Sequence, residues 1–138
     1  MKKIKVLCGL IFNSQDQLLI TRRGSGDFKG KWEFPGGKVE STETLEEALI
    51  REIKEETNTD AKINKFLGTY PITRTNKNLL YIVFEAQILS GTPKASAEIS
   101  EIITVNIESI LNQNFGATTS KVIHDWINSK TFESVISK

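Results

Sequence analysis

The feature that most constrains this chain is an acidic segment over residues 36–59, which reads GGKVESTETLEEALIREIKEETNT. It holds seven glutamates in twenty-four residues. Thr44 followed three residues later by Glu47 is a capping-box pattern, and no proline or glycine follows it in the segment. The segment therefore predicts a helix over 44–57, which the chain enters from a glycine turn at 36–37.

One face of the predicted helix changes from apolar to acidic along its length. Four apolar residues recur at helical spacing and predict a face that packs against a core, namely Leu45, Ala48, Leu49 and Ile53. Glu52 and Glu56 continue that face, and Glu55 lies beside them. Glu47 points to the solvent-facing side, where we expect it to form an ion pair with Arg51 one turn later.

Three carboxylates at the edge of a core are unfavourable by themselves. They repel one another and lose hydration unless they are protonated or bind a cation. Oxygen ligands suit a hard divalent ion, and magnesium in particular commonly bridges protein carboxylates to substrate phosphates. We therefore predict a Mg²⁺ or Mn²⁺ site on this face of the helix.

The spacing within the segment resembles the signature of the Nudix hydrolases. Gly37 is followed after five residues by Glu43, and after seven more by the run Arg51-Glu52-Ile53-Lys54-Glu55-Glu56. Asn58 stands where the family has glycine, and asparagine is the next best residue for a left-handed helix end. Thr59 stands where the family has an aliphatic residue, and we expect it to weaken the local packing.

The rest of the sequence predicts several strands and one further helix. We expect strands over 3–12, 17–23, 32–34, 61–72, 79–89 and 102–107, a hairpin turn over 73–78, a helical turn over 108–111 and a closing helix over 120–129. This order indicates an α/β or α+β fold. The resemblance covers nearly the whole chain and implies the Nudix fold, a mixed β-sheet sandwiched between helices, in a single domain over 1–138.

Composition and the single cysteine bear on compartment and partners. The chain has 138 residues, of which 25% are charged and 38% hydrophobic, as is typical of a soluble globular protein. Its net charge of +1 gives no general attraction to nucleic acid. Lys5 interrupts the apolar start and Asn13 ends it, so we expect no secretory signal. The composition predicts no membrane association. Cys8 has no partner for an internal disulfide, which favours a buried strand position in a cytoplasmic protein. Both a monomer and a homodimer stay open.

The resemblance assigns roles around the predicted metal site. It implies that the Gly37 carbonyl, Glu52 and Glu56 hold the metal, with Glu55 beside them. Family members often carry a further acidic residue in the loop before the last strand. Glu98 is our candidate for that carboxylate, as a metal ligand and in catalysis.

Neighbouring residues have supporting roles in the same scheme. We expect Glu52 or the loop glutamate to take a proton from the attacking water. Glu101 is the alternative to Glu98. The interpretation that both glutamates are solvated charges of the loop, with no role in the site, is equally good. Arg51 is expected to pair with the glutamates and orient them, with a direct contact to the substrate phosphates as the alternative. We expect Glu43 to be structural rather than a ligand.

The stretches TRR at 21–23 and WEFPGGK at 32–38 resemble the MutT-like branch, which converts nucleoside triphosphates to a monophosphate and pyrophosphate. That branch implies that Arg23 contacts the phosphates or the base, and that Thr119, in the loop before the last helix, reads the base. Four aromatic residues are candidates for contact with the base, namely Phe28, Trp32, Phe34 and Phe84, although lone aromatic residues more often belong to a core. Thr119 offers one hydroxyl where oxidised-guanine enzymes often use Asn or Asp, so 8-oxo-dGTP, CTP-type and broader substrates all stay open.

Two alternatives to nucleoside triphosphate hydrolysis also stay open. ADP-ribose and dinucleoside polyphosphate enzymes carry a proline or a tyrosine beyond the signature, and Pro71, Tyr70 and Tyr81 lie near those places without occupying them. A non-catalytic nucleotide-binding module is the other alternative. The complete set of signature glutamates favours an enzyme, because such modules usually lack them.

Overall fold

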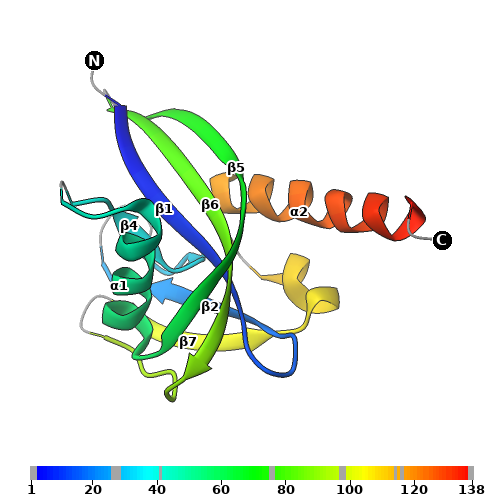
Figure 1. Ribbon diagram of the computed structural model, residues 1–138, viewed down its shortest axis with the longest axis horizontal. Helices are drawn as coiled ribbons and strands as arrows, with labels where there is room; N and C mark the ends of the chain where they lie inside the picture. Colours follow the sequence, from blue (N-terminus) through cyan, green and yellow to red (C-terminus); the bar gives the residue numbers. More distant parts are fainter. Residues whose placement is uncertain are drawn as a thin grey trace.

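The structure is a computed structural model that describes residues 3–25, 29–40, 42–74, 77–96, 99–113, 115 and 117–136. Its strands are β1 (Lys3–Phe12), β2 (Leu18–Arg23), β3 (Trp32–Glu33), β4 (Gly36–Lys38), β5 (Asp60–Arg74), β6 (Lys77–Ser90) and β7 (Ile99–Val105). Its helices are α1 (Leu45–Thr57), the 3₁₀ helix η1 (Ile107–Asn112) and α2 (Ala117–Ile136). Figure 1 shows the strands crossing the middle of the molecule, with α1 and α2 well apart from each other.

Within the described residues, seven strands form one mixed sheet. Five of them follow the order β3-β2-β1-β6-β5, and β4 and β7 lie off this path. The central strand β1 pairs in parallel with β6 along its whole length, from Lys3 opposite Asn78 to Phe12 opposite Gln87. Its other edge pairs antiparallel with β4 and then with β2. β5 and β6 form a long antiparallel hairpin, and β7 pairs with β2. The predicted mixed sheet is confirmed.

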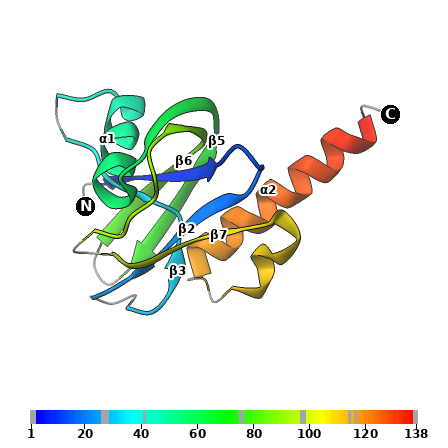
Figure 2. The same cartoon turned by 90° about the horizontal axis from the view of Figure 1, so that it is seen from below.

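Two hydrophobic clusters, one on each face of the sheet, hold the helices. Along β1, Leu7 and Ile11 belong to the cluster beneath α1, whereas Cys8, Leu10 and Phe12 belong to the cluster beneath η1 and α2. This alternation is the period of two of a strand that is buried on both faces. Figure 2 shows α1 and α2 on opposite sides of the sheet. The predicted arrangement of a sheet between helices is therefore confirmed.

Helix α1 begins and ends as the sequence predicts. The Thr44 hydroxyl accepts a hydrogen bond from the Glu47 N–H at 3.1 Å, and the Glu47 carboxylate accepts one from the Thr44 N–H at 3.2 Å. Asn58 ends the helix in the left-handed conformation, with a φ of 62°. The predicted ion pair between Glu47 and Arg51 is wrong, because Glu47 is engaged in the cap and Arg51 pairs with other glutamates.

Thr59, which departs from the family pattern, is fully buried after the end of α1. Its hydroxyl lies 2.7 Å from the Thr57 hydroxyl, which itself donates to the Ile53 carbonyl at 2.7 Å. Because the Thr57 proton is used in that bond, the Thr59 hydroxyl is the donor to Thr57. A hydrogen bond therefore satisfies the buried hydroxyl of Thr59. We expected Thr59 to weaken the local packing, but its full burial gives no sign of that.

The prediction of a turn at Gly36 and Gly37 is wrong, because both residues belong to β4. Gly37 lies opposite Leu7 and Gly36 opposite Cys8 in an antiparallel pair. A Cβ atom at Gly36 would collide with the carbonyl oxygen of Leu7. Glycine is required here for the close approach of two strands, and not for a left-handed turn.

Boundaries near the C-terminal end also differ from the prediction. The last strand ends at Val105, so Ile107 belongs to η1 instead of to the strand. The closing helix begins at Ala117 and not at residue 120, which puts Thr119 in its first turn. Within the described part of the chain, no helix combines the length and the apolar character needed to span a bilayer.

Candidate active site

The second half of α1 lies against β4, where two of its glutamates contact the paired glycines. Oε1 of Glu56 accepts a hydrogen bond from the Gly36 N–H at 2.9 Å. The carboxylate of Glu52 lies over Gly37, so that a Cβ atom at Gly37 would lie 2.5 Å from Cδ of Glu52. The lack of a side chain at Gly37 therefore leaves room for a carboxylate beside the strand.

Arg51 gathers neighbouring carboxylates around one guanidinium group. Its Nε and Nη2 donate to the two carboxylate oxygens of Glu43 at 2.6 and 2.9 Å. Its Nη1 donates to Glu52 at 3.0 Å and to Glu55 at 3.2 Å. The hydrogen bond from Arg51 lowers the pKa of Glu43, and bonding to Glu43, above all, raises the pKa of Arg51. The predicted pairing of Arg51 with the glutamates is confirmed, and Glu43 takes part in it through both carboxylate oxygens.

Glu56 is buried, with 9% of its surface exposed. Burial is the largest cause that raises its pKa to about 8, and the negative charges of Glu52 and Glu33 act in the same direction. The hydrogen bond from Gly36 and the charge of Arg23 oppose that rise. A cation next to Glu56 would favour its ionised form. The electrostatics of this carboxylate pair therefore suit a positively charged ligand.

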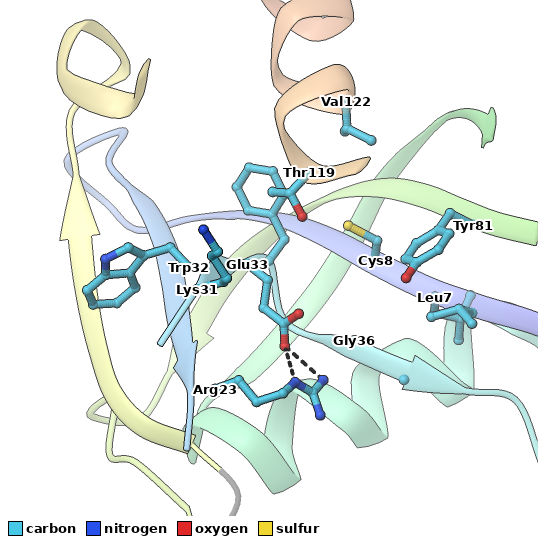
Figure 3. A pocket seen from close by; sticks show the side chains of 13 residues that line it. Leu7, Cys8, Arg23, Lys31, Trp32, Glu33, Gly36, Tyr81, Thr119 and Val122 are labelled. Carbon is cyan, nitrogen blue, oxygen red and sulfur yellow. Dashed lines mark hydrogen bonds and ion pairs between the residues drawn. The ribbon is translucent and has the colours of Figure 1, made fainter. Parts of the chain in front are cut away.

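A pocket adjoins the glycines of β4. Gly36 and Gly37 form part of its lining, together with residues of β1, β2, β3, β6 and α2. Figure 3 shows Glu33 reaching toward Arg23, with Thr119 of α2 at another side of the pocket. Nε and Nη2 of Arg23 donate to Oε1 of Glu33 at 3.1 and 2.8 Å. The pocket thus combines an ion pair, a hydroxyl and apolar walls.

Cys8 and Tyr81 also line this pocket. Cys8 is buried, as predicted, and its burial, with the charges of Glu33 and Glu56, raises the pKa of its thiol to about 12. Near neutral pH the thiol is therefore protonated, and it is not an activated nucleophile. Tyr81 comes from β6, where it lies opposite Val6.

The structure brings most of the predicted site residues into two neighbouring groups. The group at α1 and β4 contains Gly37, Arg51, Glu52, Glu55 and Glu56. The group at the pocket contains Arg23, Phe34 and Thr119. Glu98 and Phe28 lie outside the described residues, whereas Trp32 lines the pocket. The alternative to Glu98, Glu101, pairs on β7 with Arg22 at 3.2 Å.

The prediction that Phe84 contacts the base is not supported by its position. Phe84 is 5% exposed in the core beneath α1, where its ring lies 5.6 Å from that of Phe66. It is not among the residues that line the pocket. Because Tyr81 and Phe84 are three positions apart on β6, they point to opposite faces of the sheet. The aromatic residue of β6 that lines the pocket is Tyr81.

The predicted metal ligands do not form a ready set in the side chains that the structure describes. Among these residues, no three acidic, histidine or cysteine side chains are placed to hold one metal ion. Glu52 and Glu55 turn toward Arg51, and Glu56 turns toward Gly36. Metal binding therefore stays a prediction.

We predicted no role for Glu33 from the sequence, although Glu33 interacts with residues of both groups. It forms the ion pair with Arg23 and raises the pKa of Glu56. One feature of the sequence marks it, because Glu33 is a charged residue between Trp32 and Phe34, which are both buried. A strand that alternates in this way turns its middle residue to the other face.

Comparisons with known proteins agree with this architecture. A model described as the NUDIX domain matches residues 1–126. An ADP-ribose pyrophosphatase from Methanocaldococcus jannaschii is 33% identical over 122 residues, which cover 87% of this chain and 71% of that protein. An 8-oxo-dGTP diphosphatase from Haemophilus influenzae is 31% identical over 128 residues, which cover 92% of this chain and 93% of that protein. The solved structure of a MutT protein from Methanosarcina mazei Go1 matches with a TM-score of 0.81 and 30% identity, over 94% of this chain and 95% of that one. The family resemblance and the fold are confirmed.

Proposed function

The chain is a hydrolase of the NUDIX family, and from this premise we propose that it cleaves nucleoside triphosphates to a nucleoside monophosphate and pyrophosphate. The proposed substrates include oxidised nucleotides such as 8-oxo-dGTP and CTP-type nucleotides. The relative from Haemophilus influenzae supports this choice, because the match covers nearly all of both chains.

One observation carries the proposal, and it is the position of Gly36 and Gly37. Both glycines line the pocket, and both contact glutamates of α1. A nucleotide whose base and sugar lie in the pocket would therefore bring its phosphates close to the carboxylates. Binding of the nucleoside and cleavage of the phosphoanhydride would then take place at adjoining parts of one site.

We propose Mg²⁺ or Mn²⁺ as the cofactor, held by Glu52, Glu56 and the Gly37 carbonyl, with Glu55 and Glu98 as further carboxylates. The donor set fits such an ion, because hard divalent cations prefer oxygen ligands. The buried Glu56 beside Glu52 fits it too, since the negative charge of Glu52 disfavours the ionised form of Glu56 until a cation is present. When bound, the ion would neutralise charge on the phosphate oxygens.

The residues of the chain have separate tasks in this proposal. Glu52 accepts the proton of the attacking water, with Glu98 as the alternative base. Arg51 orients Glu52 through the hydrogen bond of its Nη1. Arg23 contacts the phosphates or the base, and its two hydrogen bonds to Glu33 restrict the rotamers of its guanidinium group.

Phe34 and Thr119 are the proposed contacts of the base. Phe34 is buried at the pocket wall, where its ring lies 5.9 Å from that of Phe115. Thr119 lies in the first turn of α2 and lines the same pocket. A single hydroxyl discriminates less between bases than an amide does, so we expect several bases to be accepted.

A second candidate substrate is ADP-ribose. The relative from Methanocaldococcus jannaschii favours it, because that protein is an ADP-ribose pyrophosphatase and is 33% identical to this chain. Cleavage of ADP-ribose breaks the same kind of phosphoanhydride bond and needs the same carboxylates. The two candidates differ in the group that lies beyond the scissile bond.

A panel of nucleotides tests the proposal. 8-oxo-dGTP, dCTP, CTP, ADP-ribose and a dinucleoside polyphosphate are each incubated with the protein and MgCl₂, and the products are separated by anion-exchange chromatography. We expect a nucleoside monophosphate and pyrophosphate from at least one triphosphate. Release of single phosphates, or cleavage of ADP-ribose alone, would contradict the proposed reaction on triphosphates.

A further inference from the structure

A second concavity, which we call the lysine groove, lies next to the other end of β4. The start of β1, the end of β4 and the segment that enters α1 form its walls. Its basic residues are Lys3 and Lys5 of β1 and Lys38 of β4. Figure 1 shows the start of β1 and the segment before α1 at the same end of the molecule.

The lysine groove has an excess of positive charge. Glu40 and Glu43 are the carboxylates in its lining. Glu43 accepts two hydrogen bonds from Arg51, and Glu40 lies 3.9 Å from Nη2 of the same residue. Arg51 therefore offsets part of the negative charge, while Lys3, Lys5 and Lys38 are all exposed. Ammonium groups on flexible stems are suited to bind phosphate.

The order of residues along β4 connects this groove to the candidate active site. Gly36 and Gly37 line the pocket, and the carboxylate of Glu52 lies over Gly37. The next residue, Lys38, lines the groove. The pocket and the groove therefore meet at consecutive residues of one strand, so a phosphate chain that passed Gly37 would extend toward Lys38.

We propose that the lysine groove is an anion subsite for the terminal phosphates of a polyphosphate chain, in which Lys3 and Lys5 favour nucleoside triphosphates over diphosphates. This inference rests on the proposed function, because it places the scissile bond beside Gly37. Cleavage of a triphosphate would leave the pyrophosphate product in the groove. A substrate that ends in a neutral sugar, such as ADP-ribose, gains no ionic contact there, so the groove selects for triphosphates.

Steady-state kinetics with one nucleoside as triphosphate and as diphosphate tests the subsite. We expect Lys3→Gln/Lys5→Gln to raise KM for the triphosphate by about 3- to 10-fold, since exposed ionic contacts are individually weak. KM for the diphosphate should change by less than about 2-fold, because it does not reach the lysines. The inhibition constant of pyrophosphate should rise together with KM for the triphosphate.

A matched control removes the same charge elsewhere. Lys62→Gln/Lys94→Gln changes two exposed lysines that line neither the pocket nor the groove. This variant should leave KM for the triphosphate unchanged. The subsite would be overturned if the control raised KM as much as the groove variant, or if the groove variant raised KM equally for both substrates.

Calorimetry with inorganic triphosphate, in buffer with MgCl₂, separates this inference from the proposed function. If the wild-type protein hydrolyses no nucleotide, the proposed function fails, but binding of inorganic triphosphate still measures the groove. Weaker binding by the Lys3→Gln/Lys5→Gln variant than by the control variant supports the subsite. Equal affinity in the two variants overturns it.

Discussion

The carboxylate of Glu52 occupies the space that a side chain at residue 37 would fill. A Cβ atom at Gly37 would lie 2.5 Å from Cδ of Glu52 and 2.7 Å from each of the two carboxylate oxygens of Glu52. Strand β4 and helix α1 therefore meet at this point through a glycine and a carboxylate. The spacing between Gly37 and Glu52 in the family signature corresponds to a direct contact.

We expect Gly37→Ala to reduce hydrolysis strongly while the fold is retained. The new methyl group would collide with the end of a flexible side chain, so Glu52 would leave its place but the backbone could stay. Gly36→Ala is the contrasting variant, because its methyl group would collide with the backbone of Leu7 and lower the free energy of unfolding. Initial rates and thermal unfolding of both variants check this. A fully active Gly37→Ala enzyme would contradict the role given to Glu52.

Arg51→Lys should lower activity by about 10- to 100-fold, because we propose that Arg51 orients the metal ligand Glu52 and the loss of such a residue usually has an effect of this size. Lysine keeps the charge, but it cannot bond both oxygens of Glu43 and at the same time reach Glu52. Lys54→Gln, on the same helix, is the control and should keep the wild-type rate. Initial rates of pyrophosphate release at saturating Mg²⁺ measure the effect. The prediction fails if Arg51→Lys and Lys54→Gln have equal activity.

The hydroxyls of Thr57 and Thr59 should differ in their contributions to stability. Thr57→Val leaves the buried Thr59 hydroxyl without its acceptor, which should lower the free energy of unfolding by about 1–3 kcal/mol. Thr59→Val leaves the bond from Thr57 to the Ile53 carbonyl in place, so its cost should stay below about 1 kcal/mol. Urea denaturation of both variants measures the difference. A larger loss for Thr59→Val would contradict the assigned donor order.

The metal-free protein should lose stability as the pH rises from about 4.5 to about 8. The pKa of Glu56 is raised from 4.5 to about 8 in the folded state, so the folded protein holds this proton more tightly than the unfolded chain does. Its contribution is therefore fully present below about 4.5 and is lost as the pH rises through about 8. Melting temperatures in EDTA between pH 5 and 8.5 measure it. Glu56→Gln should have a flatter profile, and parallel profiles would contradict the prediction.

Local patterns were sufficient to predict α1 and its contacts with the core. The cap at Thr44, the left-handed end at Asn58 and the buried apolar face depend on residues within a few turns of one another. The ion pair expected between Glu47 and Arg51 also followed a local rule. It failed because Glu43, which precedes the helix, folds back and offers Arg51 two oxygens.

The parts of the site that depend on distant strands could not be predicted in this way. Gly36 is needed because Leu7 lies opposite this part of β4, and the sequence contains no local sign of that pairing. The choice between Tyr81 and Phe84 depends on which face of β6 is turned toward the pocket. Both questions concern the register of strands across the sheet, which long-range packing determines.

The dependence of hydrolysis on Mg²⁺ in the wild-type protein and in Glu56→Gln tests the proposed site most directly. The rate of pyrophosphate release from a triphosphate accepted in the panel is measured against MgCl₂ concentration, with Glu46→Gln, an exposed first-turn residue, as the control. We expect no turnover in EDTA, saturation with Mg²⁺ for the wild type and the control, and a loss of about 100-fold or more in Glu56→Gln. Undiminished, Mg²⁺-saturable hydrolysis by Glu56→Gln would show that the acidic end of α1 does not perform the reaction.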